Sequence, residues 1–495
     1  MMATNERLGP PVRLSMPRAV LLGVCAVVGG TAVAYLVAYG LWLVVLALVV
    51  AVPGFVLLHR YPLVVLTVWL LVLPLVDVTS SAALRSVFWL VHRTLPVVAL
   101  AVVVVSAMLR INDRRLARLG LPEVLMGGYL VATLLSIAYT SDFVSVTVIL
   151  LYDRVFIPMV LYLLVRLLEP DERDLRLLIP AVAFVLFTQT FIAVLSWTAP
   201  GVLPSEWLGK LGERTTGSLR TADVFGVTVL FCGLFLLHAG LMSNRTTARA
   251  VSVPLFGLAL IMVFFTFSRT SWLAGLVAMI GLLFVYPRFV SRFVWVVVPL
   301  VVVMLVSGMF AWQVRFAQDR FLSEQSEESA LSRLPVAYAA ARMFGAKPLT
   351  GWGYENFDKY DFRFQSRVGD LVYPEKDHAS HNLYLTILAE QGLIGFVLFL
   401  GPMFYWLART RSGMRRMPAT GFISRKLVLI LWLVIAGNIV INNFVRVQVS
   451  FGLGMWWVAL GLIASLLARH LRTPDRDARD PEAVPAATAR GPMRR

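Results

Sequence analysis

The feature that most constrains the fold is a series of long apolar runs. We count fourteen in the 495 residues, and a membrane-crossing helix needs roughly 20 mostly apolar residues. The runs lie at 17–37, 38–58, 61–78, 94–109, 122–140, 145–168, 175–197, 222–241, 251–267, 271–287, 293–312, 384–408, 427–444 and 449–468. With 59% hydrophobic and 15% charged residues, the chain lies outside the range of soluble globular proteins. We therefore predict an all-α polytopic membrane protein with about 14 transmembrane helices, within a range of 12–14.

The basic residues predict how these helices are oriented, because short cytoplasmic loops carry an excess of Lys and Arg. With the N-terminus in the cytoplasm, 28 of the 45 basic residues fall on the inner side. We therefore expect cytoplasmic termini and an even number of spans in the inner (plasma) membrane. The net charge of +17 then reflects orientation, and no nucleic-acid partner is expected. The first run is longer than the apolar core of a signal peptide and has no clear cleavage site, so we expect it to be retained.

The pattern predicts five regions. They are a cytoplasmic N-terminus (1–16), eleven spans (17–312), a large extracytoplasmic loop (313–383), three spans (384–468) and a disordered basic cytoplasmic tail (469–495). The loop is much longer than an ordinary connection and carries nine basic against ten acidic residues. In it, five residues recur at helical spacing and predict an amphipathic helix, either on the membrane surface or against the bundle: Leu331, Leu334, Tyr338, Ala341 and Phe344.

Two polar clusters stand on the outer side of this topology. The first is Glu213-Arg214-Thr215-Thr216-Gly217-Ser218 with Arg220 and Asp223, just before the run at 222–241. The second is Ser268-Arg269-Thr270-Ser271, a short turn between two apolar runs. The fixed charge and forked donors of an arginine at such a place suit a phosphate or pyrophosphate. The alternative is an interfacial arginine that reaches lipid head groups.

A third outer cluster closes the large loop. It comprises Gly351-Trp352-Gly353-Tyr354-Glu355-Asn356-Phe357 and Asp377-His378-Ala379-Ser380-His381-Asn382-Leu383-Tyr384. Histidine accepts protons near neutral pH, so His381 or His378 is a candidate general base. A zinc site is the competing reading, but Cys25 and Cys232 lie inside apolar runs and no further outer histidine completes a ligand set. The Gly-x-Gly follows no strand pattern, so we expect a tight turn rather than a nucleotide site.

Polar residues inside the apolar runs form the fourth group, since ionisable side chains in lipid need a partner or a cavity. Asp153-Arg154 is most simply a structural pair of opposite charges. Three asparagines of one run are candidates for interhelical hydrogen bonds: Asn438, Asn442 and Asn443. Glu390 lies nine residues after His381 and either lines a cavity below the histidine or caps a polar contact.

The motifs over about 205–400 resemble the O-antigen ligase and O-antigen polymerase superfamily. The matching segments are Pro348-Leu349-Thr350-Gly351-Trp352-Gly353-Tyr354-Glu355-Asn356-Phe357, then His381-Asn382-Leu383-Tyr384-Leu385, then Glu390-Gln391-Gly392-Leu393-Ile394-Gly395. Ser268-Arg269 and Arg214-Thr215-Thr216-Gly217 match two further motifs, and Arg333 matches an arginine early in the large loop. The Asn-Pro-Asn that often follows the second of these is here Thr221-Ala222-Asp223. Such proteins usually have twelve spans, so the resemblance implies extra helices at the N-terminus.

The resemblance implies a metal-independent, inverting bacterial glycosyltransferase of the membrane-embedded C type, with no cofactor. It would transfer a glycan from an undecaprenyl-pyrophosphate donor to a glycan or glycolipid acceptor hydroxyl at the outer face of the membrane, in lipopolysaccharide or other cell-envelope polysaccharide biosynthesis. Arg214, Arg269 and Arg333 would bind the pyrophosphate, whose charge grows as it leaves, and His381 would act as the base. Supporting roles are expected for Ser268, Gly351, Gly353, His378, Asn382, Tyr384 and Glu390.

Two other functions stay open. A repeat-unit polymerase uses the same donor and differs only in its acceptor, so the sequence separates neither the two reactions nor the sugars. A polysaccharide or lipid transporter would place its polar groups near the middle of the membrane. Here the polar clusters gather at one face beside the large loop, which favours surface chemistry. No carboxylate pair of the glycosidase kind is evident, so we expect no covalent glycosyl-enzyme.

Overall fold

The chain divides into two compact units, Met1–Pro62 and Leu63–Arg495. A computed structural model describes residues 54, 56–79, 81–110, 116–208, 214–219, 221–295, 333–365, 380–444 and 449–472. In the first unit this leaves residue 54 and 56–62, of which 56–60 are helical. All that follows concerns the second unit.

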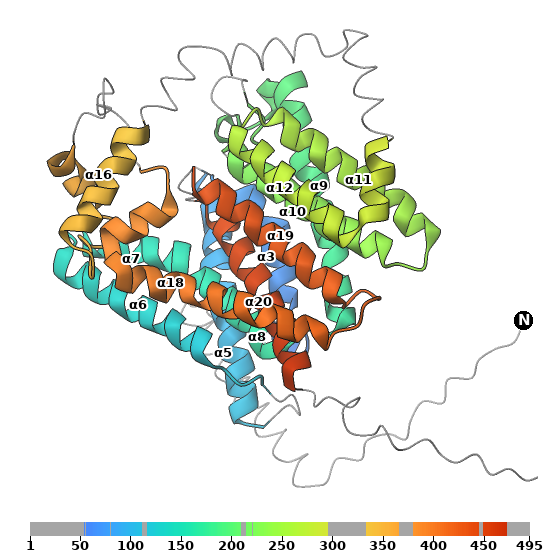
Figure 1. Cartoon of the computed structure of the whole chain (residues 1–495), viewed down its shortest axis with the longest axis horizontal. Helices are drawn as coiled ribbons and strands as arrows, with labels where there is room; N and C mark the ends of the chain where they lie inside the picture. Colours follow the sequence, from blue (N-terminus) through green and yellow to red (C-terminus); the bar gives the residue numbers. More distant parts are fainter. Residues whose placement is uncertain are drawn as a thin grey trace, which may run out of the picture. The chain divides into compact units, whose positions relative to one another are not determined.

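Helices make up the regular structure throughout the described residues, and no strand occurs among them (Figure 1). The helices are α3 (Val64–Val76), α4 (Ala82–Phe88), η1 (Trp89–Thr94), α5 (Leu95–Met108), α6 (Leu121–Thr140), α7 (Val144–Leu151), η2 (Tyr152–Phe156), α8 (Ile157–Leu168), α9 (Glu172–Thr198), η3 (Pro200–Val202), η4 (Ser205–Trp207), α10 (Ala222–Leu241), α11 (Thr246–Phe265), α12 (Arg269–Val285), α16 (Arg333–Ala346), α17 (Phe357–Tyr360), η6 (Asp361–Phe364), α18 (Leu383–Arg415), α19 (Arg425–Asn442) and α20 (Ser450–Arg472).

Nine helical stretches in the described residues are long and apolar enough to cross a membrane. They are Ala82–Met108, Leu121–Thr140, Val144–Leu168, Glu172–Thr198, Ala222–Leu241, Thr246–Phe265, Leu383–Arg415, Arg425–Asn442 and Ser450–Arg472. Two shorter apolar helices, α3 and α12, coincide with two more of the predicted runs. The runs at 17–37, 38–58 and 293–312 lie wholly or largely outside the described residues. A polytopic helical membrane protein is thus confirmed, whereas the count of fourteen stays a prediction.

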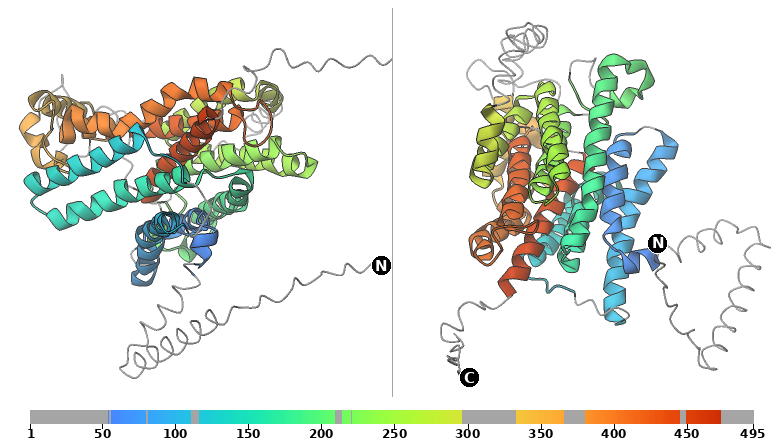
Figure 2. Two further views of the ribbon diagram at one scale, coloured as in Figure 1. Left: turned by 90° about the horizontal axis from the view of Figure 1, so that it is seen from below. Right: turned by 90° about the vertical axis from the view of Figure 1, so that its right-hand side faces the viewer.

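The core of the bundle lies along α10 and α20. Every residue of α20 from Ser450 to Ala468 is buried, and α10 is buried from Ala222 to Gly240. Glycines allow close packing around both helices, because a Cβ on Gly233 would lie 2.6 Å from the Ala259 side chain of α11, and one on Gly454 would lie 2.4 Å from Trp69 of α3. Figure 2 shows the helices packed against one another around this centre.

Two of the apolar stretches contain a π-helical turn. The segment η1 joins α4 to α5, and η2 joins α7 to α8. The two turns are bridged by an ion pair in which Arg93 Nε and Nη2 donate to Asp153 Oδ1 and Oδ2 at 2.6 and 2.5 Å. π-Helical turns inside α-helices are rare and frequently occur at functional sites. The charged residues that sequence reasoning noted at 153–154 therefore stand on a local break of the helix.

The helix α16 lies within the predicted loop segment 313–383, and the predicted apolar stripe does not face the rest of the protein, so packing on the bundle is not the alternative realised by Leu334 and Tyr338. The buried side chains of α16 are Val336, Ala339, Ala340 and Met343, and they pack with Phe357 of α17 and Ala389 of α18. Leu334 and Tyr338 of the predicted stripe are about half exposed, at 49% and 50%. Both faces of α16 are apolar, and the small alanines let it approach α18 closely. Of the predicted stripe, Leu331 lies outside the described residues.

Candidate functional site

The turn that carries Arg269 is clamped onto the start of α10. Ser268 and Thr270 both donate a hydroxyl hydrogen bond to Asp223 Oδ1, and all three residues are at least 92% buried. Ser268 is also the N-cap of α12, where its Oγ accepts from Ser271 N at 3.3 Å. Arg269 stands between the two buried hydroxyl residues and is itself exposed. The fold therefore fixes the backbone on both sides of this arginine and turns its side chain outward.

The segment before α10 is held just as firmly. Ser218 Oγ donates to the Pro74 carbonyl at 2.6 Å, and the Gln189 side chain both donates to Ser218 Oγ and accepts from Ser218 N, at 2.7 and 3.1 Å. Gly217 has a positive φ of 54°, and a Cβ there would lie 2.4 Å from Gln189 Oε1. Only glycine fits this turn. Arg214 begins the described part of the segment and is exposed, whereas Arg220 lies outside the described residues.

The start of α18 carries the candidate base. His381 is half-buried and has a φ of +49°, a left-handed conformation that is uncommon for a non-glycine residue. Asn382 caps the helix, because its Oδ1 accepts from Tyr384 N at 3.0 Å and Leu385 N at 2.9 Å. Its amide Nδ2 donates to the Asn443 carbonyl at 3.0 Å, just beyond α19. The strained position of His381 is thus fixed by a cap that is tied to a second helix.

Arg333 reaches the same end of α19. Its Nη1 donates to the Phe444 carbonyl at 3.2 Å, so Arg333 and Asn382 bind consecutive carbonyl groups. The N-terminus of α12 also lies at this end, since α12 and α19 pack antiparallel. A Cβ on Gly281 would meet Leu433, whereas one on Gly437 would approach Ala274 at 3.8 Å. The structure therefore gathers the starts of α10, α12, α16 and α18 around the end of α19.

The Gly351-Trp352-Gly353 turn packs against the part of α18 that contains Gly392. The helix α18 is broken at Gly392, whose φ and ψ are 63° and −164°. The turn before α17 fills the break with backbone hydrogen bonds in both directions. Trp352 N donates to the Ala389 carbonyl at 3.0 Å, and Gly353 N donates to the Glu390 carbonyl at 2.7 Å. In return, Leu393 N donates to the Pro348 carbonyl at 2.8 Å, and Ile394 N donates to the Leu349 carbonyl at 3.2 Å. A Cβ on Gly351 would lie 2.3 Å from the Glu390 carbonyl carbon. The expected tight turn is present, and its partner is the broken helix.

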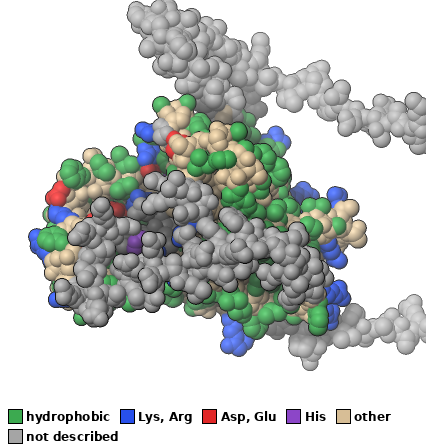
Figure 3. Space-filling view, turned by 90° about the horizontal axis from the view of Figure 1, so that it is seen from above, with side chains coloured by type: hydrophobic (Ala, Val, Ile, Leu, Met, Phe, Trp, Pro, Cys, Tyr) green, Lys and Arg blue, Asp and Glu red, His purple; other side chains and the backbone are tan. Residues whose placement is uncertain are grey.

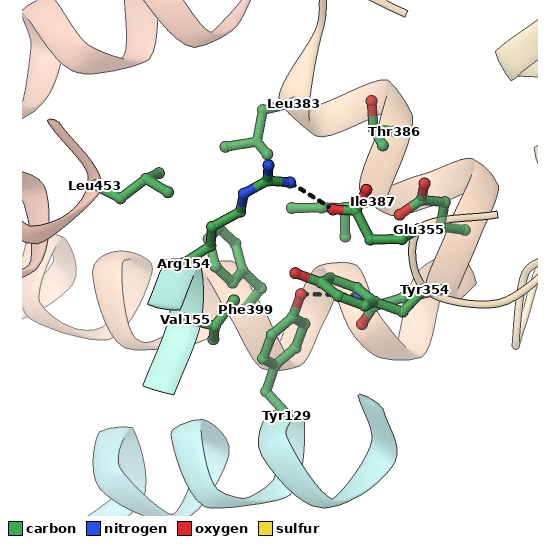
Figure 4. A pocket seen from close by; sticks show the side chains of 12 residues that line it. Tyr129, Arg154, Val155, Tyr354, Glu355, Leu383, Thr386, Ile387, Phe399 and Leu453 are labelled. Atoms are coloured by element: carbon green, nitrogen blue, oxygen red, sulfur yellow. Dashed lines mark hydrogen bonds and ion pairs between the residues drawn. The ribbon is translucent and has the colours of Figure 1, made fainter. Parts of the chain in front are cut away.

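A cavity of about 40 Å³, lined by both apolar and charged side chains, lies beside the start of α18 (Figure 4). Thr386, Ile387 and Glu390 of α18 line one side, and Arg154 of η2 reaches into it. Arg154 Nη1 donates to Glu355 Oε1 at 3.0 Å, and Glu390 Oε1 accepts from Phe357 N at 3.2 Å. Glu390 thus lines a cavity and accepts from a backbone N–H, and His381 is not among the residues that line this cavity. The cavity exceeds the roughly 10–15 Å³ that a cavity needs to hold a water molecule.

Asp153 and Arg154 do not form a pair with each other in the described contacts. Asp153 binds Arg93, and Arg154 binds Glu355. The contact between Lys359 Nζ and Asp142 Oδ2, at 2.6 Å, is another link between the loop and the α6–α7 connection, and this hydrogen bond raises the pKa of Lys359. Sequence reasoning missed Arg93 and Glu355 as ion-pair partners. For Arg93 the signal was an ionisable residue directly before an apolar run, which needs a counter-charge, whereas Glu355 lies in the polar loop motif and its partner follows only from the packing.

The remaining predicted residues have simpler surroundings. Asn438 and Asn442 donate to the carbonyls of Val434 and Asn438 in their own helix, so the described contacts do not include the expected bond between helices for these two. Asn443 does accept such a bond from Asn382. The Tyr384 hydroxyl is buried and has no hydrogen-bond partner among the described residues. His378 lies outside the described residues, so a zinc pair with His381 stays untested.

Figure 3 shows one face of the molecule on which a histidine and several Lys or Arg side chains reach the surface.

The comparisons with known proteins concern this part of the chain. Residues 254–400 match the family model described as O-antigen ligase, a segment that includes Arg269, Arg333 and His381. A protein of Rickettsia felis named "Putative polysaccharide ligase" is 24% identical over 205 residues, which cover 39% of this chain and 46% of that protein. The chain thus spans about half the length of this relative. The family match confirms, over residues 254–400, the resemblance to the O-antigen ligases that the motifs indicate.

Proposed function

We propose that this protein is a membrane-embedded glycosyltransferase of the O-antigen ligase type. It transfers a glycan from undecaprenyl pyrophosphate to an acceptor hydroxyl at the extracytoplasmic face of the cytoplasmic membrane. The observation that carries the proposal is the gathering around the end of α19, where Asn382 and Arg333 bind consecutive carbonyls and α12 begins with Arg269. The family match of residues 254–400 supports a reaction of ligase or polymerase type.

The arginines bind the pyrophosphate in this proposal. A pyrophosphate that leaves the anomeric carbon gains negative charge on the bridging oxygen, and preorganised cations lower the barrier to that step. Arg269 is suited to this because its backbone is fixed on both sides while its side chain is exposed. Arg214 and Arg333 are the second and third ligands. Arg333 uses Nη1 for the Phe444 carbonyl, and its guanidinium has further donors.

His381 acts on the acceptor. It accepts the proton of the attacking hydroxyl, whose oxygen forms the new bond to the anomeric carbon as the bond to the pyrophosphate oxygen breaks. A single displacement of this kind inverts the anomeric configuration and needs no metal or covalent glycosyl-enzyme. The turn 351–353 and Gly392 hold the first part of α18, and with it His381, against α16.

A repeat-unit polymerase is the second candidate, because it uses the same donor and the same residues. A transporter is a third, from a different class. The gathering of the candidate residues at helix ends, rather than in the middle of the apolar helices, favours the enzyme. Loss of glycan attachment with accumulation of lipid-linked polymer in a deletion strain supports a ligase, whereas accumulation of single repeat units supports a polymerase. Unchanged glycans would point to transport.

The direct test uses purified protein and a lipid-linked donor. His381→Ala and Arg269→Ala should abolish glycan transfer while the amount of inserted protein stays the same. His470→Ala and Arg176→Ala are matched controls. Within the part of the chain that the structure describes, His470 bonds the Leu466 carbonyl of its own helix, and Arg176 pairs with Glu172 of its own helix and lies over the Phe422 ring. Full transfer by the His381→Ala protein would overturn the mechanism.

A further inference from the structure

We infer that Asp223 is a positioning residue for Arg269, so that it governs how the protein binds a pyrophosphate group. This inference rests on the proposed function, in which Arg269 binds the donor pyrophosphate. Asp223 is separated from Ser268 by 45 positions in the sequence, yet it accepts hydrogen bonds from both residues that flank Arg269.

The contacts fix the backbone on both sides of the arginine. Ser268 and Thr270 are 5% and 8% exposed, and both hydroxyls point to Asp223 Oδ1. A hydroxyl that donates to the carboxylate can still accept, and Ser268 Oγ does so from Ser271 N. The residue between two such anchors has its Cα–Cβ bond fixed, and Arg269 is exposed at that point. The Asp223 carboxylate thus holds the backbone from which the Arg269 side chain extends.

Close packing of α10 and α12 supports this geometry. A Cβ on Gly226, one turn after Asp223, would lie 2.4 Å from Ser271 Oγ, and Ser271 Oγ donates to the Ala222 carbonyl at 3.4 Å. Phe267, just before the turn, has a φ of +46°. The turn is therefore over-determined by its neighbours, which is the condition under which a strained backbone persists and holds a side chain in place.

The position of Asp223 at the start of α10 also favours an aspartate over other residues. It lies in the first turn of α10, where the helix dipole favours a negative charge. A carboxylate accepts two hydroxyl hydrogen bonds at one oxygen, which an alanine lacks altogether. Asparagine keeps one carbonyl oxygen in the same position, so it should hold Ser268 and Thr270 nearly as well.

The test measures binding of inorganic pyrophosphate to the purified full-length protein, and glycan transfer from the lipid-linked donor in parallel. Asp223→Ala should weaken pyrophosphate binding and raise the donor KM by about 10-fold to 100-fold, the scale expected when a binding group is displaced by about 1 Å. The acceptor KM should not change. Asp223→Asn should restore binding to within about threefold of the wild type, because the accepting oxygen is retained.

Two further variants separate positioning from simple loss of structure. Thr270→Val should weaken pyrophosphate binding, and combined with Asp223→Ala it should add little, because both changes remove the same contact. Asp171→Ala is the matched control, since Asp171 caps the start of α9 by accepting from Asp174 N at 2.8 Å. It removes a carboxylate from a helix start elsewhere and should leave the donor KM unchanged.

The possible failures are distinct. If the Asp223→Ala protein binds pyrophosphate as the wild type does while Arg269→Ala does not, the positioning role is wrong and the proposed function stands. If Arg269→Ala also binds pyrophosphate normally, both the positioning role and the role of Arg269 in the proposed function are overturned. If Asp223→Ala and Asp171→Ala both raise the donor KM and the acceptor KM to the same extent, the defect is a general structural one and the inference is refuted.

Discussion

Replacing Gly392 by alanine should destabilise the protein, although Gly-to-Ala changes within helices are usually favourable. Gly392 breaks α18 with φ and ψ of 63° and −164°, a combination that is essentially restricted to glycine. An added Cβ would also lie 2.4 Å from the carbonyl carbon and oxygen of Leu349. Backbone atoms cannot rotate out of the way as a flexible side chain can. Either α18 or the turn 348–353 must therefore move.

The magnitude follows from the contacts that such a shift would break. The backbone conformation alone costs about 1–3 kcal/mol for a residue with a side chain. Displacing Leu349 also weakens the bonds from Leu393 N to the Pro348 carbonyl and from Ile394 N to the Leu349 carbonyl, at 2.8 and 3.2 Å. Two backbone hydrogen bonds at about 0.5–1.5 kcal/mol each bring the expected loss to about 2–6 kcal/mol.

The assay is reversible unfolding in mixed detergent and dodecyl sulfate micelles, followed by circular dichroism. Gly257→Ala is the matched control, because Gly257 lies inside α11 with open space around its Cα. That change should be neutral or stabilise the protein by up to about 1 kcal/mol. If Gly392→Ala and Gly257→Ala shift the free energy of unfolding equally, the contact between α18 at Gly392 and the turn 348–353 does not contribute to stability.

Two further predictions use the same unfolding assay. Asn382→Ala should lower the free energy of unfolding by about 0.5–2 kcal/mol through loss of the α18 cap, whereas Asn382→Asp keeps an accepting oxygen for Tyr384 N and should lower it less; equal losses would contradict the capping role. For the ion pair, Arg154→Met and Glu355→Gln should be less damaging together than their separate effects predict, with a coupling of about 0.5–3 kcal/mol. Strict additivity would show that the 3.0 Å contact contributes nothing.

The helices could be predicted from the sequence because membrane-crossing segments must satisfy their backbone groups internally. Eleven of the fourteen apolar runs coincide with apolar helices of the structure. The orientation of α16 could not be predicted in the same way, since large side chains with apolar surface stand on both faces, Leu334 and Tyr338 on one and Val336 and Met343 on the other. The choice between them depends on a tertiary contact with α18 that periodicity does not encode.

The sequence could predict which residues are candidates for the site, but not which residues form hydrogen bonds or ion pairs with them. Arginines and a histidine at the ends of apolar runs are informative because ionisable groups are costly in lipid. That Asp223 binds Ser268 and Thr270 follows only from the packing of α10 on α12. The interpretation of Asp153-Arg154 as a pair overlooked that adjacent helical residues do not face each other. Each instead binds a residue on a different segment.

The end of α19 explains how segments far apart in the sequence can form one site. The last carbonyl groups of a helix lack partners within the helix, so they need donors from elsewhere. Here Asn443 and Phe444, just beyond α19, receive those donors from Asn382 and Arg333, which begin α18 and α16. The helix α12 is held along α19 by the close contact of Gly281 with Leu433. A shift of α19 would therefore move the segments that carry Arg269, Arg333 and His381 together, which preserves their mutual geometry better than three independent loops would.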